Sequence, residues 1–198
     1  TADHMERSME KAVTAEAGLI VLRIDTPGGL DMAMREMIKI ILASPLPIVG
    51  YVSPSGARAA SAGTYLLYAT HLAAMAPGTN LGAATPVQLG GGSPELPSMP
   101  GNDDAKDGKP EGESKENTGA APPGDAMERK VVNDAVAYIR SLAQLRSRNG
   151  DWAERAVREG VSLSANDALE QGVIELVADS MENLLKQLDG RQVTLDKK

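Results

Sequence analysis

Residues 47–76 read PIVGYVSPSGARAASAGTYLLYATHLAAMA, with two short apolar segments on either side of a run of small residues. The outer segments, 47–52 and 71–76, are typical of buried parallel strands, and 61–70 predicts a buried helix between them. A strand, a helix and a second strand in this order predict a right-handed crossover in a parallel sheet. Ligands of such sheets bind beyond the carboxyl ends of the strands, where the small residues before Ser61 are expected.

The alternation of strands and helices continues on both sides of this stretch. Toward the amino terminus, GLIVLRI (18–24) predicts a strand, and apolar residues at helical spacing predict helices over 3–16 and 30–43. Toward the carboxyl terminus the pattern predicts further elements: a helix to about Arg146, one from Asp151, a short one between Ser164 as N-cap and Gly172 as C-cap, a strand at 173–178, a helix near 180–188 and a final short strand.

Residues 88–125 differ in composition from the rest of the chain. They are dominated by Gly, Pro, Ser, Asp, Glu and Lys and contain few large apolar residues. Such a segment cannot bury enough apolar surface to offset the entropy of ordering, and it is too long for a simple connection. We therefore expect a single domain over 1–198 with a disordered or mobile insertion at about 88–125.

The composition excludes several classes of function. A net charge of −7 argues against a nucleic-acid surface, and the absence of Cys excludes disulfides, thiol nucleophiles and thiolate zinc sites. With two histidines, a histidine-rich metal centre is not expected, and nothing in the sequence indicates a cofactor. No apolar run approaches the length of a membrane span, so the sequence predicts a chain that is soluble by itself.

Two turns that follow predicted strands contain the residues best suited to chemistry. In DTPGG (25–29), Gly28 and Gly29 can adopt backbone conformations that expose N–H groups, and such donors stabilise a developing oxyanion. In AASAGTY, Ser61 lies where a helix begins, so that the N–H of Ala62 could contribute a second donor. This arrangement suits acyl transfer. From these residues alone, a simple turn at DTPGG and a serine that permits close helix packing remain equally open.

Taken together, these segments resemble a known family. The sequence over 18–41, 47–87 and the helical region after Arg129 is similar to the protease domain of the NfeD family, membrane-bound serine proteases of the ClpP class. The resemblance covers nearly all of the chain outside 88–125. It implies an α/β fold, a ClpP/crotonase-like spiral of β-β-α units with a mostly parallel sheet. It also implies a strand ahead of the opening helix and a longer, membrane-anchored parent.

The resemblance implies roles for five residues. Ser61 matches the nucleophile and Lys130 the general base, while Gly28 or Gly29 and the backbone of Ala62 match the oxyanion hole. A lysine acts as a base only when it is neutral, so we expect Lys130 to be buried at the start of its helix.

At one position this sequence lacks a catalytic residue that ClpP has. Ala84 lies at or beside the place of the catalytic histidine in ClpP, and His71 is ten residues from Ser61. A Ser-Lys dyad is therefore expected rather than a Ser-His-Asp triad. Asp25 is interpreted as a turn residue, Trp152 as a core or interface residue, and Met32, Met34 and Met37 as core or as part of an apolar groove.

Three functions remain in view at this point. The first is a Ser-Lys endopeptidase that cleaves a hydrophobic peptide segment, which the resemblance identifies with a stomatin-like (slipin) membrane protein. It also implies a homodimer whose catalytic domain lies on the extracytoplasmic side of a membrane. The second is a crotonase-type acyl-CoA enzyme, for which basic residues that bind phosphate cannot be placed. The third is a non-catalytic domain that binds a membrane protein through an apolar groove.

Overall fold

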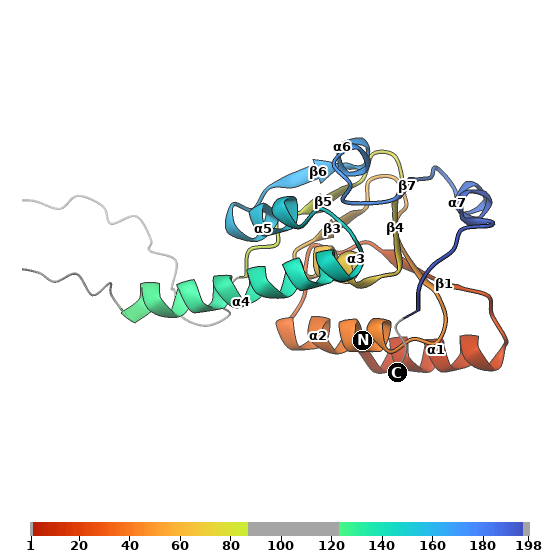
Figure 1. Cartoon of the computed structure of the whole chain (residues 1–198), viewed down its shortest axis with the longest axis horizontal. Coiled ribbons are helices and arrows are strands. Elements are labelled where there is room, and N and C mark those ends of the chain that lie inside the picture. The colour runs from red at the N-terminus through yellow and green to blue at the C-terminus, as the bar shows by residue number, and fades with distance from the viewer. Residues whose placement is uncertain (1, 87–122, 196–198) are drawn as a thin grey trace, which may run out of the picture.

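The larger of two sheets, sheet A, forms the centre of the molecule (Figure 1). The computed structural model describes residues 2–86 and 123–195, with the backbone alone at 123–125. Sheet A has the order β1-β2-β4-β7, and every pairing in it is parallel. Its strands are β1 (Ile20–Ile24), β2 (Ile48–Val52), β4 (Leu72–Met75) and β7 (Leu176–Val177). All five residues of β2 are buried, which explains the continuous apolar run in the sequence.

A second, smaller sheet lies beside sheet A and was not predicted from the sequence. It contains β3 (Arg58–Ala60), β5 (Asn80–Gly82) and β6 (Ser162–Ser164) in the order β3-β5-β6. The first pair is parallel and the second antiparallel. Strands of three residues are too short for a recognisable periodicity. The expectation that the segment before Ser61 directly follows a strand of the main sheet is therefore wrong, because β3 lies between.

Helices cover both faces of sheet A. One face packs against α1 (Ala2–Thr14), α2 (Asp31–Leu42) and α3 (Ala62–Ala69) in the main core, which includes the fully buried Ile38 and Ile41. The other face, with Val49 and Ala74, packs against Leu184 and Leu188 of α7 (Met181–Leu188). The predicted amino-terminal helices are confirmed to within three residues at each end. The final strand expected after α7 is wrong, because residues 191–195 form no strand.

The helices of the carboxyl-terminal part form the remaining layer. They are α4 (Pro123–Leu145), α5 (Gly150–Arg158) and α6 (Ala165–Glu170). Asn149 caps α5, since its side chain accepts a hydrogen bond from the Trp152 amide, and Ser164 caps α6 as the sequence predicts. Gly172 has a φ of 66° just after α6, as expected for a helix-terminating glycine.

The helix α4 begins earlier than expected and extends away from the body of the molecule (Figure 1). Its buried residues start at Ala135 and continue through Val136, Ile139, Leu142 and Ala143. The insertion expected at about 88–125 lies outside the described residues, except that 123–125 already belong to α4.

A buried arginine connects α3 to the carboxyl-terminal half. The Arg148 side chain is 1 % exposed and forms a two-pronged ion pair with Glu175, at 2.8 and 2.9 Å. Its Nη1 also donates to the carbonyls of Leu67 and Tyr68, at 2.8 and 3.1 Å. These carbonyls belong to the last turn of α3, so Arg148 donates to acceptors that have no partner within that helix.

Candidate active site

Ser61 lies in a strained turn between β3 and α3. Its φ and ψ are 52° and −118°, a combination that non-glycine residues rarely adopt. The side chain makes no capping hydrogen bond to α3 and is partly exposed. A serine at a sharp strand-to-helix turn, with its hydroxyl pointing outward, is the arrangement found at nucleophiles of serine hydrolases.

Hydrogen bonds to two strands of the smaller sheet hold this turn. The Ser61 amide donates to the Gly82 carbonyl at 3.0 Å. The Thr64 hydroxyl lies within 2.8 Å of the Ala59 carbonyl and 3.0 Å of the Gly82 carbonyl, and it accepts from the Gly82 amide. The first turn of α3 is therefore fastened to β3 and β5, which keeps Ser61 in its strained conformation.

The DTPGG turn lies directly against Ser61. Thr26 pairs with β3 by hydrogen bonds between its backbone and Arg58 and Ala60. A Cβ placed on Gly28, whose φ is 145°, would lie 3.1 Å from the Ser61 Cβ and 3.4 Å from its Oγ. A Cβ on Gly29 would lie 3.8 Å from the Ala62 Cβ. The structure thus brings both glycines to Ser61.

The two glycine amides differ in their hydrogen bonding. The Gly28 N–H donates to the Thr26 hydroxyl at 3.1 Å, and that hydroxyl lies 2.9 Å from the Gly28 carbonyl. The Gly29 N–H donates to none of the described residues. Ala62 is the first residue of α3, so its N–H has no partner within the helix. Of the two glycines left open by the sequence, Gly29 has the available donor.

Ser61 opens into a cleft of about 250 Å³ between α2, α3 and α4. The cleft is mostly apolar, with Asp31 and Arg35 as the charged residues on its wall; the other lining residues are Gly29, Leu30, Met34, Ala62, Tyr65, Ala84, Pro86 and Ala135. The Tyr65 hydroxyl donates to the Ala84 carbonyl at 3.3 Å, and burial raises the pKa of this phenol. A second apolar cleft of about 380 Å³ adjoins it across Gly29 and Met34.

The structure places Lys130 differently from the sequence prediction. Lys130 lies in the third turn of α4 and its side chain is exposed, so the expected burial at a helix start is wrong. It is not among the residues that line the cleft with Ser61, although Ala135 of the same helix is. The preceding residues Glu128 and Arg129 line a separate depression beside Arg158.

The structure also places the less prominent residues singled out in the sequence. Asp25 accepts a hydrogen bond from the Arg58 amide at 3.2 Å, so its side chain joins the DTPGG segment to β3. His71 is buried, and its Nδ1 accepts from the Ile48 amide at 3.1 Å. It lies outside the Ser61 cleft, whereas Ala84 lines the cleft. Trp152 is buried in the core and Met32 is exposed.

Sequence reasoning missed Arg35, which lines the cleft from α2. Its guanidinium pairs with Asp31 at 2.9 Å and with Asp134 of α4 at 2.6 Å. The spacing of Asp31 and Arg35, four residues apart on one helix, was a signal for the first pair. The second pair joins residues 99 positions apart and has no local signature.

Over residues 2–86 and 123–195, no group of three or more His, Cys, Asp or Glu side chains is placed to hold a metal ion. None of the helices there is both long enough and apolar enough to span a bilayer.

Comparison with known sequences identifies similar proteins. The family model for the NfeD1b N-terminal domain matches residues 1–95. The chain is 37% identical over 197 residues to membrane-bound protease PH1510 of Pyrococcus horikoshii, and 32% identical over 201 residues to membrane protein NfeD1b of Bacillus subtilis. These matches cover 98% and 94% of this chain, but the chain spans only 38% of the length of either relative.

Solved structures agree with these sequence matches. A serine-to-alanine mutant of 1510-N, a membrane-bound stomatin-specific protease, superposes with a TM-score of 0.77 at 36% identity, over 97% of this chain and 79% of that one. A lysine-to-alanine mutant in complex with a substrate peptide gives 0.73 at 36% identity, over 98% and 80%. The expected α/β fold, a ClpP-like spiral with a mostly parallel main sheet, is confirmed. The chain therefore belongs to the NfeD family, and its fold is that of the family's N-terminal domain.

Proposed function

We propose that this chain is the catalytic domain of a serine endopeptidase in which Ser61 is the nucleophile and Lys130 the general base. The observation that carries the proposal is the strained Ser61 turn, with its hydroxyl at a cleft and the Gly29 and Ala62 amides beside it. In the relatives of known structure, a serine and a lysine were each replaced by alanine, and the lysine mutant holds a substrate peptide.

The reaction follows from these positions. The neutral amine of Lys130 takes the proton of the Ser61 hydroxyl while its Oγ attacks the peptide carbonyl. The carbonyl oxygen becomes an oxyanion, which the N–H groups of Gly29 and Ala62 stabilise, with Gly28 shaping the turn that holds them. The Lys130 ammonium then gives this proton to the leaving nitrogen, and the amine so regenerated takes a proton from the water that hydrolyses the acyl-enzyme.

Lys130 must approach Ser61 for this step, because its side chain points into solvent in the single chain. We therefore propose that binding of substrate, or of a second subunit, brings the base to the nucleophile and removes water from around it.

The substrate that fits this site is an apolar peptide. Both clefts beside Ser61 are lined mainly by aliphatic and methionine side chains. One relative is named stomatin-specific, so we propose a hydrophobic segment of a stomatin-like membrane protein as the substrate. We further propose one domain over 1–198, a homodimer, and a membrane-anchored parent protein with this domain on the extracytoplasmic side.

Labelling by a serine-directed phosphonate tests the proposal. The unmodified chain, Ser61→Ala and Lys130→Ala are compared from pH 6 to 10, an interval chosen to bracket the titration of a lysine in a changed environment. Labelling should vanish in Ser61→Ala, and Lys130→Ala should lose the increase in rate with pH. Equal rates with and without the lysine amine would refute the dyad. Absence of peptide hydrolysis in a labelled, folded chain would favour the non-catalytic binding domain instead.

A further inference from the structure

The segment of α4 that contains Lys130 has little contact with the hydrophobic core, where only the partly buried Val132 packs against it. Ala135 is the first buried residue of the helix, and none of the described side chains before it, from Ala126 on, is buried. The backbone of this segment extends beyond the body of the molecule (Figure 1). Polar contacts with the neighbouring helices therefore contribute to where Lys130 points.

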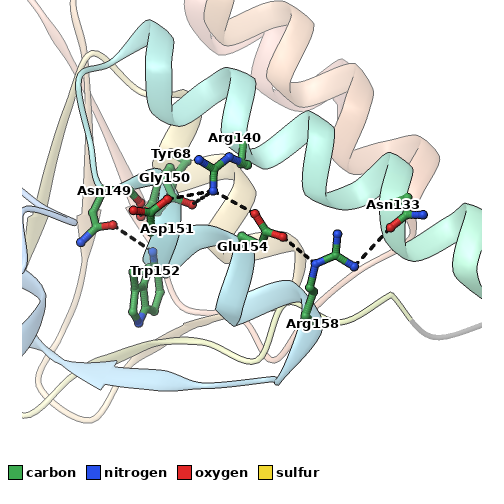
Figure 2. Close-up of polar contacts among 9 residues, drawn as sticks. All are labelled: Tyr68, Asn133, Arg140, Asn149, Gly150, Asp151, Trp152, Glu154 and Arg158. Atoms are coloured by element: carbon green, nitrogen blue, oxygen red, sulfur yellow. Dashed lines mark hydrogen bonds and ion pairs between the residues drawn. The ribbon is translucent and has the colours of Figure 1, made fainter.

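An arginine from α5 holds one residue of this segment. Arg158 Nη1 donates to the Asn133 side-chain oxygen at 3.2 Å, and its Nε pairs with Glu154 at 2.6 Å. The other oxygen of Glu154 accepts from Arg140 of α4 at 2.9 Å, and Arg140 also pairs with Asp151. Figure 2 shows this row of side chains along the line where α4 and α5 meet. Glu154, itself held by Arg140, thus fixes the guanidinium of Arg158 that reaches Asn133.

An arginine from α2 holds the next residue of α4. Arg35 Nη2 pairs with Asp134 at 2.6 Å while its Nε pairs with Asp31 of its own helix. The guanidinium carbon lies 4.5 Å from the ring centroid of Tyr138, one turn further along α4. The edge of the planar guanidinium donates to the two aspartates, while its face lies over the ring of Tyr138.

Asn133 and Asp134 are the residues three and four positions after Lys130, so all three side chains lie on one face of α4. The arginines reach this face from two different helices. The helix cannot rotate about its axis, or bend toward one neighbour, without breaking one of the two contacts. We infer that Arg35 and Arg158 are positioning residues, which set the orientation of α4 and so the place of Lys130; the inference rests on the proposed function.

The experiment measures phosphonate labelling of Ser61 in two backgrounds. Arg35→Gln, Arg158→Gln and the double variant are made in the 198-residue chain and again in the presence of Lys130→Ala. A misplacement of about 1 Å can cost about 100-fold in rate, and the helix keeps its core contacts, so we expect a loss of about tenfold in the double variant. With Lys130→Ala the same substitutions should change the rate by less than about twofold, because the arginines act through the lysine.

Hydrolysis of a fluorogenic peptide of Leu, Ile and Val gives a second reading. Arg158 is outside the Ser61 cleft, so Arg158→Gln should lower kcat with little change in KM, and Arg158→Lys should restore part of the loss. Arg155→Gln is the matched control, since Arg155 pairs only with Glu159 of its own helix among the described residues, at 3.2 Å. Trp152 fluorescence verifies that each variant is folded.

The outcomes separate a failure of the positioning role of the two arginines from a failure of the proposed Ser61–Lys130 dyad. Equal losses in both backgrounds would mean that the arginines shape the Ser61 turn directly, and this would overturn the inference. A rate no lower than that of Arg155→Gln would overturn it as well. If Lys130→Ala alone labels as fast as the unmodified chain, the dyad itself fails, and the inference fails with it.

Discussion

Replacing Gly28 by alanine should abolish activity while leaving most of the stability. The φ of 145° at this residue belongs to a region that is nearly exclusive to glycine, and an added Cβ would lie 3.1 Å from the Ser61 Cβ. That separation is shorter than ordinary van der Waals contact, so either the turn or Ser61 must move. The adjacent Gly29 amide, the proposed oxyanion donor, moves with the turn.

Two costs can be separated in this variant. The backbone strain is worth about 1–3 kcal/mol of stability. Loss of one oxyanion donor lowers the rate by about 100-fold to 1,000-fold, and displacement of Ser61 adds to that. We therefore expect a small decrease in the free energy of unfolding and a decrease of at least about 100-fold in labelling and hydrolysis.

Gly56→Ala is the matched control, because Gly56 has a φ of 89° and a Cβ there would meet nothing within 4 Å. It carries a similar backbone cost without the contact to Ser61, so its labelling rate should stay close to that of the unmodified chain. Urea unfolding followed by Trp152 fluorescence gives the stability of both variants. If Gly28→Ala labels as fast as Gly56→Ala, the proposed geometry of the oxyanion hole is refuted.

Two further predictions concern the frame around the site. Arg148→Met removes the cation that pairs with the partly buried Glu175 and the donor to the Leu67 and Tyr68 carbonyls, and should lower the free energy of unfolding by about 3 kcal/mol, the lower end of the cost of breaking a buried pair. A loss below about 1 kcal/mol, the range of the exposed Arg155 pair, would contradict the role given to this ion pair. Burial raises the pKa of Tyr65 and of Tyr68 above that of an unfolded tyrosine, so the folded state keeps protons that the unfolded state releases. Their contribution is complete below about pH 10 and is lost as pH rises further. Urea unfolding between pH 9 and 11 checks this, an interval spanning the usual titration near 10; Tyr68→Phe should weaken the alkaline loss, and an unchanged slope would contradict it.

The parts of the fold that follow from sequence are those with a local signature. The strands of sheet A are continuous apolar runs, and the helices have apolar faces at regular spacing, so both were predictable. The contact of the DTPGG turn with Ser61 was only partly predictable, because DTPGG follows β1 of sheet A as expected, whereas Ser61 follows β3 of the smaller sheet. The strands of the smaller sheet have three residues each, which is too few to show a period.

The site residues that sequence could not place depend on long-range geometry. Arg35 and Asp134 are 99 positions apart, and the sequence around either residue has no pattern that indicates the contact. The exposure of Lys130 follows from the early start of α4, which places the lysine in the third turn, ahead of the first buried residue, Ala135. A residue type and its neighbours can suggest a general base, but its distance from the nucleophile depends on how a whole helix is held.

The smaller sheet, the element least visible in the sequence, gives the site its strain. A backbone conformation such as that of Ser61 costs about 1–3 kcal/mol and persists only where surrounding contacts hold it. Those contacts are made by the Gly82 carbonyl of β5 and by the Thr64 hydroxyl, which joins β3 to β5. Gly82 has no room for a side chain, because a Cβ there would overlap the Val161 carbonyl next to β6. The three short strands therefore form a frame whose close packing holds the hydroxyl of Ser61 at the cleft, and a change at Gly82 should release that strain before it disturbs sheet A.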